Sequence, residues 1–271
     1  MATIGFIGGG NMAASLIGGL INAGVPASEI TVADPEETRL TSLKDRFNIN
    51  TTKDNGITLN SDTVVLAVKP QLLKSVCQDL QLDTDVNKLF ISIAAGVNSD
   101  TIDRWLGNNK AIVRCMPNTP ALVQTGASGL FANAHVSDDQ RQQAETILRA
   151  VGIAVWVDDE AQLNAVTAVS GSGPAYFFLM MEAMQQAGES LGLSADAAQK
   201  LVLQTALGAA KMASTSNIMP AELRRQVTSK GGTTEQAILS FQTDGFEKIV
   251  SRALSAANER SITLAKELDS E

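Results

Sequence analysis

A glycine pattern directly behind the first apolar segment limits the folds that the start of this chain can adopt. Residues Thr3 to Ile7 predict a short strand, and Gly8-x-Gly10-x-x-Ala13 follows before a helical stretch at 14–23. A strand, turn and helix with G-x-G-x-x-G/A spacing form the fingerprint of dinucleotide binding. Gly8 would make the tight turn, Gly10 would let the backbone approach a pyrophosphate, and Ala13 would keep the helix close to the strand.

A second strand, predicted at 30–33, ends at Asp34. In a Rossmann unit, an acidic residue about twenty positions behind the glycines binds the ribose hydroxyls. The fingerprint, both strands, the helix and the acid together favour a Rossmann-type nucleotide-binding domain over a glycine-rich turn without a ligand.

The first 160 residues alternate short apolar segments with polar or helical stretches, which predicts a mainly parallel sheet with helices on its faces. After about Asp159 the strands stop, and helices broken by glycine or proline follow. We therefore expect an α/β Rossmann-type domain at residues 1–160 and an all-α domain at residues 161–271. The further expected strands are 63–68, 89–93, 111–115, 128–131 and 153–157.

Three motifs close strands of the predicted sheet. They are Ala67-Val68-Lys69-Pro70, Ala94-Ala95-Gly96 and Arg114-Cys115-Met116-Pro117-Asn118-Thr119-Pro120. Taken singly, each proline or glycine indicates only a loop. Because ligands bind beyond the carboxyl ends of strands in open parallel sheets, the shared position predicts that these loops surround the cofactor.

A second group of glycines and hydroxyls, Ser229-Lys230-Gly231-Gly232-Thr233-Thr234-Glu235-Gln236, precedes a predicted helix. Thr233 is predicted to cap this helix, with Gln236 at the spacing of a capping box. The free N–H groups of a helix start, and the close approach that glycine allows, favour binding of a carboxylate or phosphate. The alternative is an ordinary glycine turn before a capped helix.

The most apolar helix is predicted from Pro174 to Leu191, with Pro174 in its first turn and Ser172 as its cap. Its residues are apolar on nearly every side. This favours burial against a second copy of the chain in a homo-oligomer, with a core inside the domain as the alternative.

Composition excludes several classes of partner. A net charge of -8 and a pI near 4.8 argue against nucleic acid or an anionic membrane. Cys77 and Cys115, without a CxxC motif or histidine partners, predict neither a disulfide nor a metal site. The chain starts without a cationic signal-peptide region, and its longest apolar run meets Glu182 too soon to span a bilayer. We therefore expect a cytoplasmic protein.

Six motifs follow one another along nearly the whole chain: Gly5-Phe6-Ile7-Gly8-Gly9-Gly10-Asn11-Met12, Ala67-Val68-Lys69-Pro70, Ser92-Ile93-Ala94-Ala95-Gly96-Val97, Met116-Pro117-Asn118-Thr119-Pro120, Ser170-Gly171-Ser172-Gly173-Pro174-Ala175-Tyr176 and Gly231-Gly232-Thr233-Thr234. As a set they resemble the pyrroline-5-carboxylate reductase family. The resemblance implies a Rossmann domain followed by a helical dimerisation domain, with NADPH or NADH as cofactor. It also implies reduction of the cyclic imine (S)-1-pyrroline-5-carboxylate to L-proline, the last step of proline biosynthesis, by dimers that assemble into larger rings such as a decamer.

The resemblance also assigns residues to the two ligands. The substrate would be bound by Glu160, Ser229, Gly231, Gly232, Thr233 and Thr234, with its carboxylate on backbone N–H groups from Gly231 to Thr234. For Glu160, a solvated acidic turn shared with Asp158 and Asp159 is the alternative. The cofactor would be bound by Ile7, Gly8, Gly9, Gly10, Asn11, Met12, Asp34, Asn55, Ala67, Val68, Lys69, Pro70, Ala94, Ala95, Gly96, Met116 and Asn118.

Thr234 is the catalytic residue that the resemblance implies, because it matches the family position whose hydroxyl lies near the ring nitrogen. The nicotinamide transfers the hydride, so the protein has to orient two ligands and supply or tolerate one proton. A threonine is a poor general acid, which favours positioning of an iminium over relay of a proton.

Two positions depart from the family pattern. Lys230 stands where the family commonly has proline, and Asp34 stands where many members carry a small hydroxyl residue suited to a 2'-phosphate. An acid at position 34 would prefer a ribose hydroxyl and repel that phosphate, so NADH stays open beside NADPH.

Two other functions also stay open. A β-hydroxyacid dehydrogenase of similar build would need a catalytic lysine on a helix behind the domain boundary, for which Lys200 and Lys211 are the candidates. A non-catalytic dinucleotide-binding regulator would leave Gly231 to Thr234 without a ligand.

Overall fold

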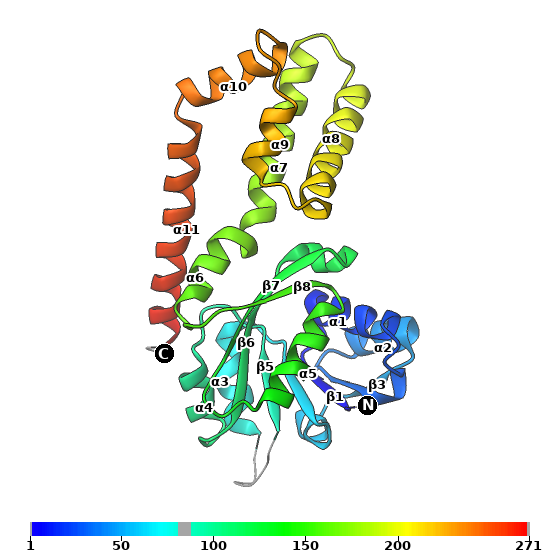
Figure 1. Cartoon of the computed structure of the whole chain (residues 1–271). Helices are drawn as coiled ribbons and strands as arrows, with labels where there is room; N and C mark the ends of the chain where they lie inside the picture. Colours follow the sequence, from blue (N-terminus) through cyan, green and yellow to red (C-terminus); the bar gives the residue numbers. More distant parts are fainter. Residues whose placement is uncertain (1, 81–87, 270–271) are drawn as a thin grey trace. The chain divides into compact units, whose positions relative to one another are not determined.

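The computed structural model describes residues 2–80 and 88–269, and the chain divides into two compact units (Figure 1). Unit 1 comprises the residues up to Ser172 together with those from Ala257 onward, and unit 2 comprises Gly173–Ala256. Helix α11 (Phe246–Asp269) contributes residues to both units. The chain therefore leaves unit 1 once and returns to it through its last helix.

Unit 1 is built on one eight-stranded sheet with the order β3-β2-β1-β4-β5-β6-β7-β8. The strands from β3 to β6 are parallel, whereas β7 runs antiparallel to β6 and β8 runs parallel to β7. The predicted α/β fold with a mainly parallel sheet is therefore confirmed. The strands are β1 (Ile4–Ile7), β2 (Ile30–Ala33), β3 (Asn50–Thr52), β4 (Thr63–Leu66), β5 (Leu89–Ser92), β6 (Ala111–Met116), β7 (Gly126–Ala132) and β8 (Gly152–Trp156).

Strand β3 is the one that the sequence does not predict. Its residues Asn50, Thr51 and Thr52 are polar, and it lies at the edge of the sheet beside β2. An edge strand without apolar alternation carries no sequence signal of its own, so it is recognised only from its pairing.

The strand order reverses direction at β1, which pairs with β2 on one side and β4 on the other. Ile7 at the end of β1 lies in register with Ala33 of β2 and Leu66 of β4. In open α/β sheets such a switch point opens a crevice beyond the carboxyl ends of the strands. The segment that follows Ile7 is the predicted glycine loop, so the topology places that loop at the crevice.

Alternate residues of each central strand belong to two hydrophobic clusters, one on each face of the sheet. Phe6 and Val65 pack with helices α1, α2 and α5, whereas Ile7 and Leu66 pack with α3 and α4. Figure 1 shows the sheet between these two helical layers. Because both faces are buried, the strands carry continuous apolar runs. The helices of unit 1 are α1 (Asn11–Asn22), α2 (Glu37–Phe47), α3 (Pro70–Asp79), α4 (Ser99–Trp105), α5 (Asp138–Arg149) and α6 (Gln162–Val166), with short 3-10 turns at Ala27–Glu29, Asn55–Asn60 and Thr119–Val123.

Unit 2 consists of helices, as predicted. They are α7 (Gly173–Ser190), α8 (Ala195–Thr215), α9 (Pro220–Gln226), α10 (Thr233–Thr243) and the first part of α11. Over residues 2–80 and 88–269, no helix combines the length and apolarity that crossing a membrane requires.

Helix α7 begins at Gly173, within one residue of the prediction, but the predicted cap at Ser172 is wrong. Residues Thr167–Gly171 form a π-helical turn, and Ser172 has right-handed helical dihedrals instead of the extended conformation of a cap. Gly171 therefore belongs to the π-helical turn, and the two units divide directly behind it, between Ser172 and Gly173.

Candidate active site

The glycine loop begins at Gly8, a position whose backbone conformation and surroundings admit only glycine. Gly8 has φ +100, and a Cβ atom there would lie 2.6 Å from the carbonyl oxygen of Ala67. Its N–H donates to the carbonyl of Ala33 at 2.8 Å, while the N–H of Ala67 donates to the carbonyl of Ile7 at 2.8 Å. The loop therefore turns sharply between the ends of β2 and β4. Of the predicted cofactor residues, Ile7, Gly8 and Ala67 are brought together here.

Gly10 has a different environment. It caps α1 in an extended conformation, and a Cβ atom there would meet no atom within 4 Å. The start of α1 has no side-chain cap, Asn11 is exposed and Met12 is half-buried. Open space in front of uncapped N–H groups at a helix start fits the pyrophosphate of a dinucleotide. The residues present thus fit an NAD(P)H cofactor.

Asp34 lies directly behind β2, and its side chain is only 2% exposed. One oxygen, Oδ2, accepts from the N–H of Gly9 at 2.8 Å, and Oδ1 accepts from the N–H of Glu36 at 2.9 Å. Arg39 Nη1 donates to both oxygens, at 3.0 and 3.2 Å. The carboxylate that was expected to bind a ribose hydroxyl is therefore engaged by the protein itself.

The same contacts set the charge of Asp34. Burial by itself raises the pKa of this carboxyl group, but the hydrogen bonds from Gly9, Glu36 and Arg39 outweigh burial, so the pKa lies below its ordinary value. Asp34 also raises the pKa of Arg39 through their hydrogen bond. Both side chains are therefore charged at neutral pH.

The other loops of the parallel strands differ in how they are fixed. Lys69 is exposed and precedes α3, which Pro70 begins, while Val68 is half-buried.

In the loop behind β5, Ala94 is buried and Gly96 has φ +80. A Cβ atom at Gly96 would lie 3.0 Å from Leu268 of α11, in the part of α11 that belongs to unit 1. The loop 94–96, in which Ala95 is exposed, is thus backed by the end of the chain.

Asn118 is predicted to bind the cofactor, but its side chain is buried and bonded within the protein. Its Nδ2 donates to the carbonyl oxygen of Ser170 at 3.3 Å and to the Ser170 hydroxyl at 3.2 Å. Its Oδ1 accepts from the N–H of Ala127 at 2.9 Å, and the Ser170 hydroxyl donates to the Ala127 carbonyl at 3.1 Å. Beside them, a Cβ atom at Gly171 would lie 2.5 Å from Met116 Cε. These contacts tie the loop behind β6 to β7 and to the π-helical turn.

Glu160 is not part of a solvated acidic turn. Oε1 accepts from the N–H of Ser99 at 2.6 Å and from Arg114 Nη1 at 2.8 Å, and Oε2 accepts from the Ser99 hydroxyl at 2.8 Å. Arg114 Nη1 also donates to Asn98 Oδ1 at 3.1 Å. Glu160 therefore holds the start of α4 and neutralises a nearly buried arginine on β6.

Asn55, the last predicted cofactor residue of unit 1, begins the 3-10 turn behind β3. It is half-buried, and its carbonyl oxygen accepts from the Thr58 hydroxyl at 2.7 Å. Its side-chain amide has no bond within the described part of the chain. It is therefore available to a ligand, unlike the amide of Asn118.

In unit 2, the predicted capping arrangement at Thr233 is wrong by one residue. Gly232 is the cap of α10, Thr233 is its first helical residue, and no side chain caps the helix. Glu235 Oε2 accepts from the N–H of Gly231, the residue before the cap, at 2.7 Å, so the predicted capping box with Gln236 does not form. Gly231 has φ +74, and a Cβ atom at Gly232 would lie 2.5 Å from the Ser229 hydroxyl. The helix therefore starts at Thr233, one residue earlier than predicted, directly behind the glycine turn.

This geometry narrows the predicted anion site. The N–H groups of Gly231 and Gly232 are bonded to Glu235 and to the Ser229 carbonyl. The N–H groups of Thr233 and Thr234, and the Thr234 hydroxyl, have no acceptor among the described residues. Ser229 and Lys230 are exposed beside them. The start of α10 therefore offers two adjacent backbone donors and a hydroxyl group to an anion.

Three charged side chains of these sites have no role assigned from the sequence: those of Arg39, Arg114 and Glu235. Arg39 lies five residues behind Asp34 in the first turn of a helix, and Glu235 is at capping-box spacing once Gly232 is taken as the cap. Arg114 is the one charged residue within the apolar run of the buried strand β6, which is a signal for a charged partner. The candidate lysines of the dehydrogenase alternative are exposed on α8, where Lys200 pairs with Asp196 at 2.8 Å.

Comparison with known proteins adds to this geometry. Residues 160–264 match the family model for pyrroline-5-carboxylate reductase dimerisation, and residues 3–96 match a model described as NADP oxidoreductase coenzyme F420-dependent. The chain is 57% identical to the pyrroline-5-carboxylate reductase of Pseudomonas aeruginosa over 98% of this chain and 97% of that protein. It is 45% identical to the enzyme of the same name from Haemophilus influenzae over 95% of this chain and 96% of the relative.

Solved structures agree with the sequence relatives. A pyrroline-5-carboxylate reductase from Coxiella burnetii matches with a TM-score of 0.95 at 46% identity, covering 97% of this chain and 98% of that one. A Plasmodium falciparum pyrroline carboxylate reductase with NADP bound matches with a TM-score of 0.84 at 30% identity and the same coverage of 97% and 98%. By sequence and by fold, this chain belongs to the pyrroline-5-carboxylate reductase family.

Proposed function

We propose that two sets of residues serve the two ligands of this enzyme, which reduces (S)-1-pyrroline-5-carboxylate to L-proline with NADPH or NADH. Residues 1–160 would bind the dinucleotide, and residues 161–271 would supply the substrate loop and the dimer contact. The observation that carries the proposal is the start of α10, where two free N–H groups adjoin the Thr234 hydroxyl. An anion and an imine nitrogen in one small molecule need such a pair of sites.

On the cofactor side, the glycine loop and the start of α1 would hold the pyrophosphate, because Gly8 makes the turn and Gly10 leaves open space. The half-buried amide of Asn55 and the loops 67–70 and 94–96 would line the rest of the dinucleotide. The bound nicotinamide supplies the hydride. Asn118 and Glu160 would act indirectly, since their side chains hold the loops behind β6 and β5.

On the substrate side, the carboxylate would accept from the N–H groups of Thr233 and Thr234. The positive end of the helix dipole favours an anion at this point. The bond between Glu235 and the N–H of Gly231 supports the proposal, because it fixes the turn that presents these donors. Lys230 is exposed in the same turn and adds a positive charge where the family commonly has proline.

The Thr234 hydroxyl would orient the ring nitrogen of the substrate. It is half-buried and free of intramolecular bonds within the described residues. A hydroxyl group of ordinary acidity is a poor proton donor at neutral pH, but it accepts a hydrogen bond from a protonated iminium. Thr234 therefore contributes orientation, and the iminium brings its own proton.

A substrate without a carboxylate tests this assignment. We expect Gly232→Ala, whose Cβ would displace Ser229, to lower kcat/KM for pyrroline-5-carboxylate by roughly ten-fold or more. With 1-pyrroline, the same variant should change kcat/KM by less than about two-fold, because this substrate has no carboxylate for the loop to bind. Equal losses with both imines would contradict carboxylate binding at this loop.

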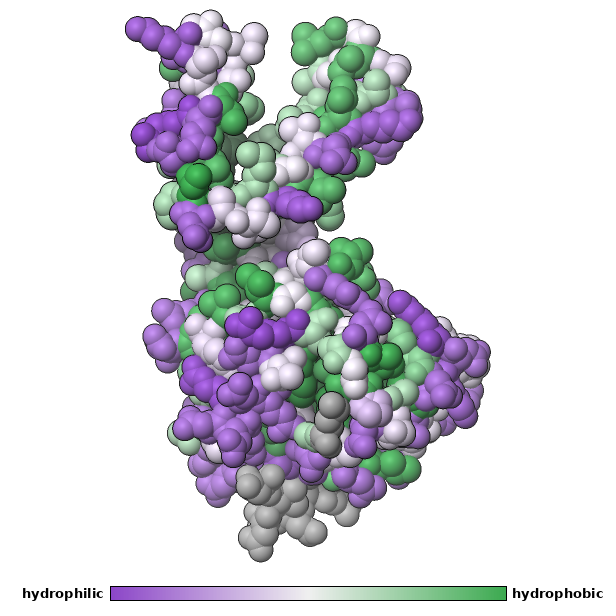
Figure 2. Space-filling model, turned by 45° about the vertical axis from the view of Figure 1, so that its right-hand side comes forward, coloured by the Kyte–Doolittle hydropathy of each residue, from purple (hydrophilic) through white to green (hydrophobic). Residues whose placement is uncertain are grey.

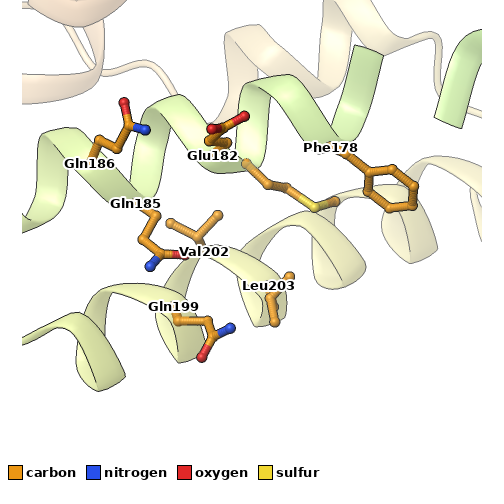
Figure 3. A pocket seen from close by; sticks show the side chains of 8 residues that line it. Phe178, Glu182, Gln185, Gln186, Gln199, Val202 and Leu203 are labelled. Atoms are coloured by element: carbon orange, nitrogen blue, oxygen red, sulfur yellow. The ribbon is translucent and has the colours of Figure 1, made fainter. Parts of the chain in front are cut away.

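The dimerisation domain presents an apolar surface that supports a homodimer. Figure 2 shows hydrophobic residues at the surface of the helical unit, and the exposed residues of α7 include Phe177 at 69% and Leu179 at 65%. Between α7 and α8 of unit 2 lies a hollow of about 430 Å³, lined by Phe178 and Val202 among others (Figure 3). Large aromatic and aliphatic side chains exposed side by side on one helix are typical of an obligate interface.

We propose a homodimer through this surface, and a decamer as a pentamer of dimers. Sedimentation equilibrium of the wild type and of Phe177→Asp tests the first step. The variant should dissociate at concentrations where the wild type is dimeric or larger, because a charge would enter an apolar interface. A cytoplasmic location is proposed as well, supported by the free, buried thiols of Cys77 and Cys115.

A further inference from the structure

The end of β2 carries a specificity arrangement that differs from the usual one. In most Rossmann domains an acid at this point binds the 2'-hydroxyl of NAD, and an arginine nearby accommodates the 2'-phosphate of NADP. Here the acid, Asp34, is 2% exposed and both of its oxygens accept hydrogen bonds from the protein. The Asp34 carboxylate is therefore not accessible to a ribose hydroxyl, and it has no free lone pair with which to accept a hydrogen bond from one.

Arg39 is the group that faces outward at this edge. Its side chain is 44% exposed, and Nη1 donates to the same Asp34 oxygen that accepts from the N–H of Gly9. Asp34 Oδ2 therefore bridges the guanidinium of Arg39 and the backbone of the glycine loop. The guanidinium cannot lose its charge at working pH, and its planar fork suits a phosphate.

One acid competes with a phosphate for Arg39. Glu36 Oε2 lies 2.6 Å from Arg39 Nη2, and the Glu36 side chain is 53% exposed. The neighbouring Glu37 is instead paired with Lys53 at 2.7 Å. An exposed ion pair is weak and screened by salt, so a phosphate can displace Glu36 at small cost.

We propose that Arg39 discriminates NADPH from NADH in this chain, that Glu36 opposes NADPH by competing for Arg39, and that Asp34 positions Arg39 and the glycine loop. The proposal rests on the use of NAD(P)H by the enzyme and is independent of the substrate loop. It differs from the expectation from the sequence that the acid at position 34 binds a ribose hydroxyl and repels a 2'-phosphate.

The test is the dissociation constant of each reduced cofactor, measured by fluorescence titration without pyrroline-5-carboxylate. Arg39→Gln should raise Kd for NADPH by roughly ten-fold to a hundred-fold, because a charge-assisted bond to phosphate is lost. Kd for NADH should stay within about two-fold. Arg149→Gln is the matched control, since Arg149 lies in an exposed ion pair with Glu145 on α5 and should alter neither constant.

Glu36→Gln should change the affinity for NADPH in the opposite direction, and misfolding cannot produce such a gain in affinity. The variant should lower Kd for NADPH several-fold and leave Kd for NADH unchanged, because the competing acid is gone. Asp34→Asn should weaken both cofactors to a similar extent, with a smaller thermal shift on adding either one. Equal changes for the two cofactors in Arg39→Gln, an unchanged ratio in Glu36→Gln, or a selective gain for NADPH in Asp34→Asn would overturn the proposal.

Discussion

The carboxylate of Asp34 holds the backbone of Gly9 through a hydrogen bond of 2.8 Å between Oδ2 and the Gly9 N–H. This bond joins the end of β2 to the glycine loop behind β1, across 25 positions of the sequence. A Cβ atom at Gly9 would lie 3.5 Å from the same oxygen, so the loop and the acid are in close contact. The geometry of the nucleotide loop therefore depends on the charge state of one buried carboxyl group.

Asp34 makes the stability of the protein depend on acid pH. Its folded-state pKa is lowered, so its contribution to the free energy of unfolding is full above the unfolded-state pKa, about 3.9, and is lost as pH falls through the folded-state value. The difference in free energy of unfolding between wild type and Asp34→Asn should be constant from about pH 7 to about pH 5 and shrink below about pH 4. Urea unfolding across this range measures it, and a difference that persists unchanged at about pH 3 would contradict the prediction.

The first and third glycines of the loop should respond differently to alanine. Gly8→Ala adds a Cβ atom 2.6 Å from the Ala67 carbonyl at φ +100, so we expect a lower melting temperature and at least about a ten-fold rise in cofactor Kd. Gly10→Ala meets no atom within 4 Å, so the protein without cofactor should keep its melting temperature while the cofactor binds more weakly. Thermal unfolding with and without NADPH distinguishes them. The same response from both variants would show that Gly10 does not face the ligand.

Asn118 should matter mainly for stability. Asn118→Ala leaves the N–H of Ala127 without its acceptor and removes two bonds to Ser170, which predicts a loss of about 1–3 kcal/mol in the free energy of unfolding. Kd for NADPH, measured well below the melting temperature, should change by less than about three-fold. A large change in Kd with normal stability would mean that Asn118 contacts the cofactor directly.

The two cysteines should be inert in the folded enzyme. Burial raises the pKa of Cys77 to about 12, and burial also raises the pKa of Cys115 to about 12 against a small opposing effect of Ser128. At about pH 8 almost no thiolate is present, and the thiolate is the reactive form. Ellman's reagent should therefore report no thiol in the native enzyme and both thiols in denaturant. Rapid modification of either cysteine with retained activity would contradict the described burial.

The sequence predicts the elements whose signals are local. Gly8, Gly10 and the strands on both sides of them lie within one short segment, so spacing and apolar pattern suffice to predict the Rossmann unit. The roles of polar side chains do not follow in this way. Asn118 and Ser170 are 52 residues apart, and Ser99 and Glu160 are 61 apart, so only the folded chain brings them together. The capping residue of α10 is Gly232, one position before the predicted Thr233, because helix ends in a glycine turn are predictable from sequence only to within a residue or two.

We propose that Thr234 orients the nitrogen of the imine that this chain reduces. The most direct measurement is the initial rate of NADPH and NADH oxidation with pyrroline-5-carboxylate, with L-proline determined in parallel, for wild type, Thr234→Val and Thr234→Ser. Thr146→Val is the matched control, because Thr146 is exposed on α5 and, within the described residues, its hydroxyl bonds only to the Gln142 carbonyl.

We expect one L-proline per cofactor oxidised in the wild type and a loss of roughly ten-fold to a hundred-fold in kcat/KM for Thr234→Val. Thr234→Ser should keep most of the activity, and Thr146→Val should match the wild type. Full activity of Thr234→Val, or no L-proline from the wild type with either cofactor, would contradict the proposed role of Thr234 or the activity itself.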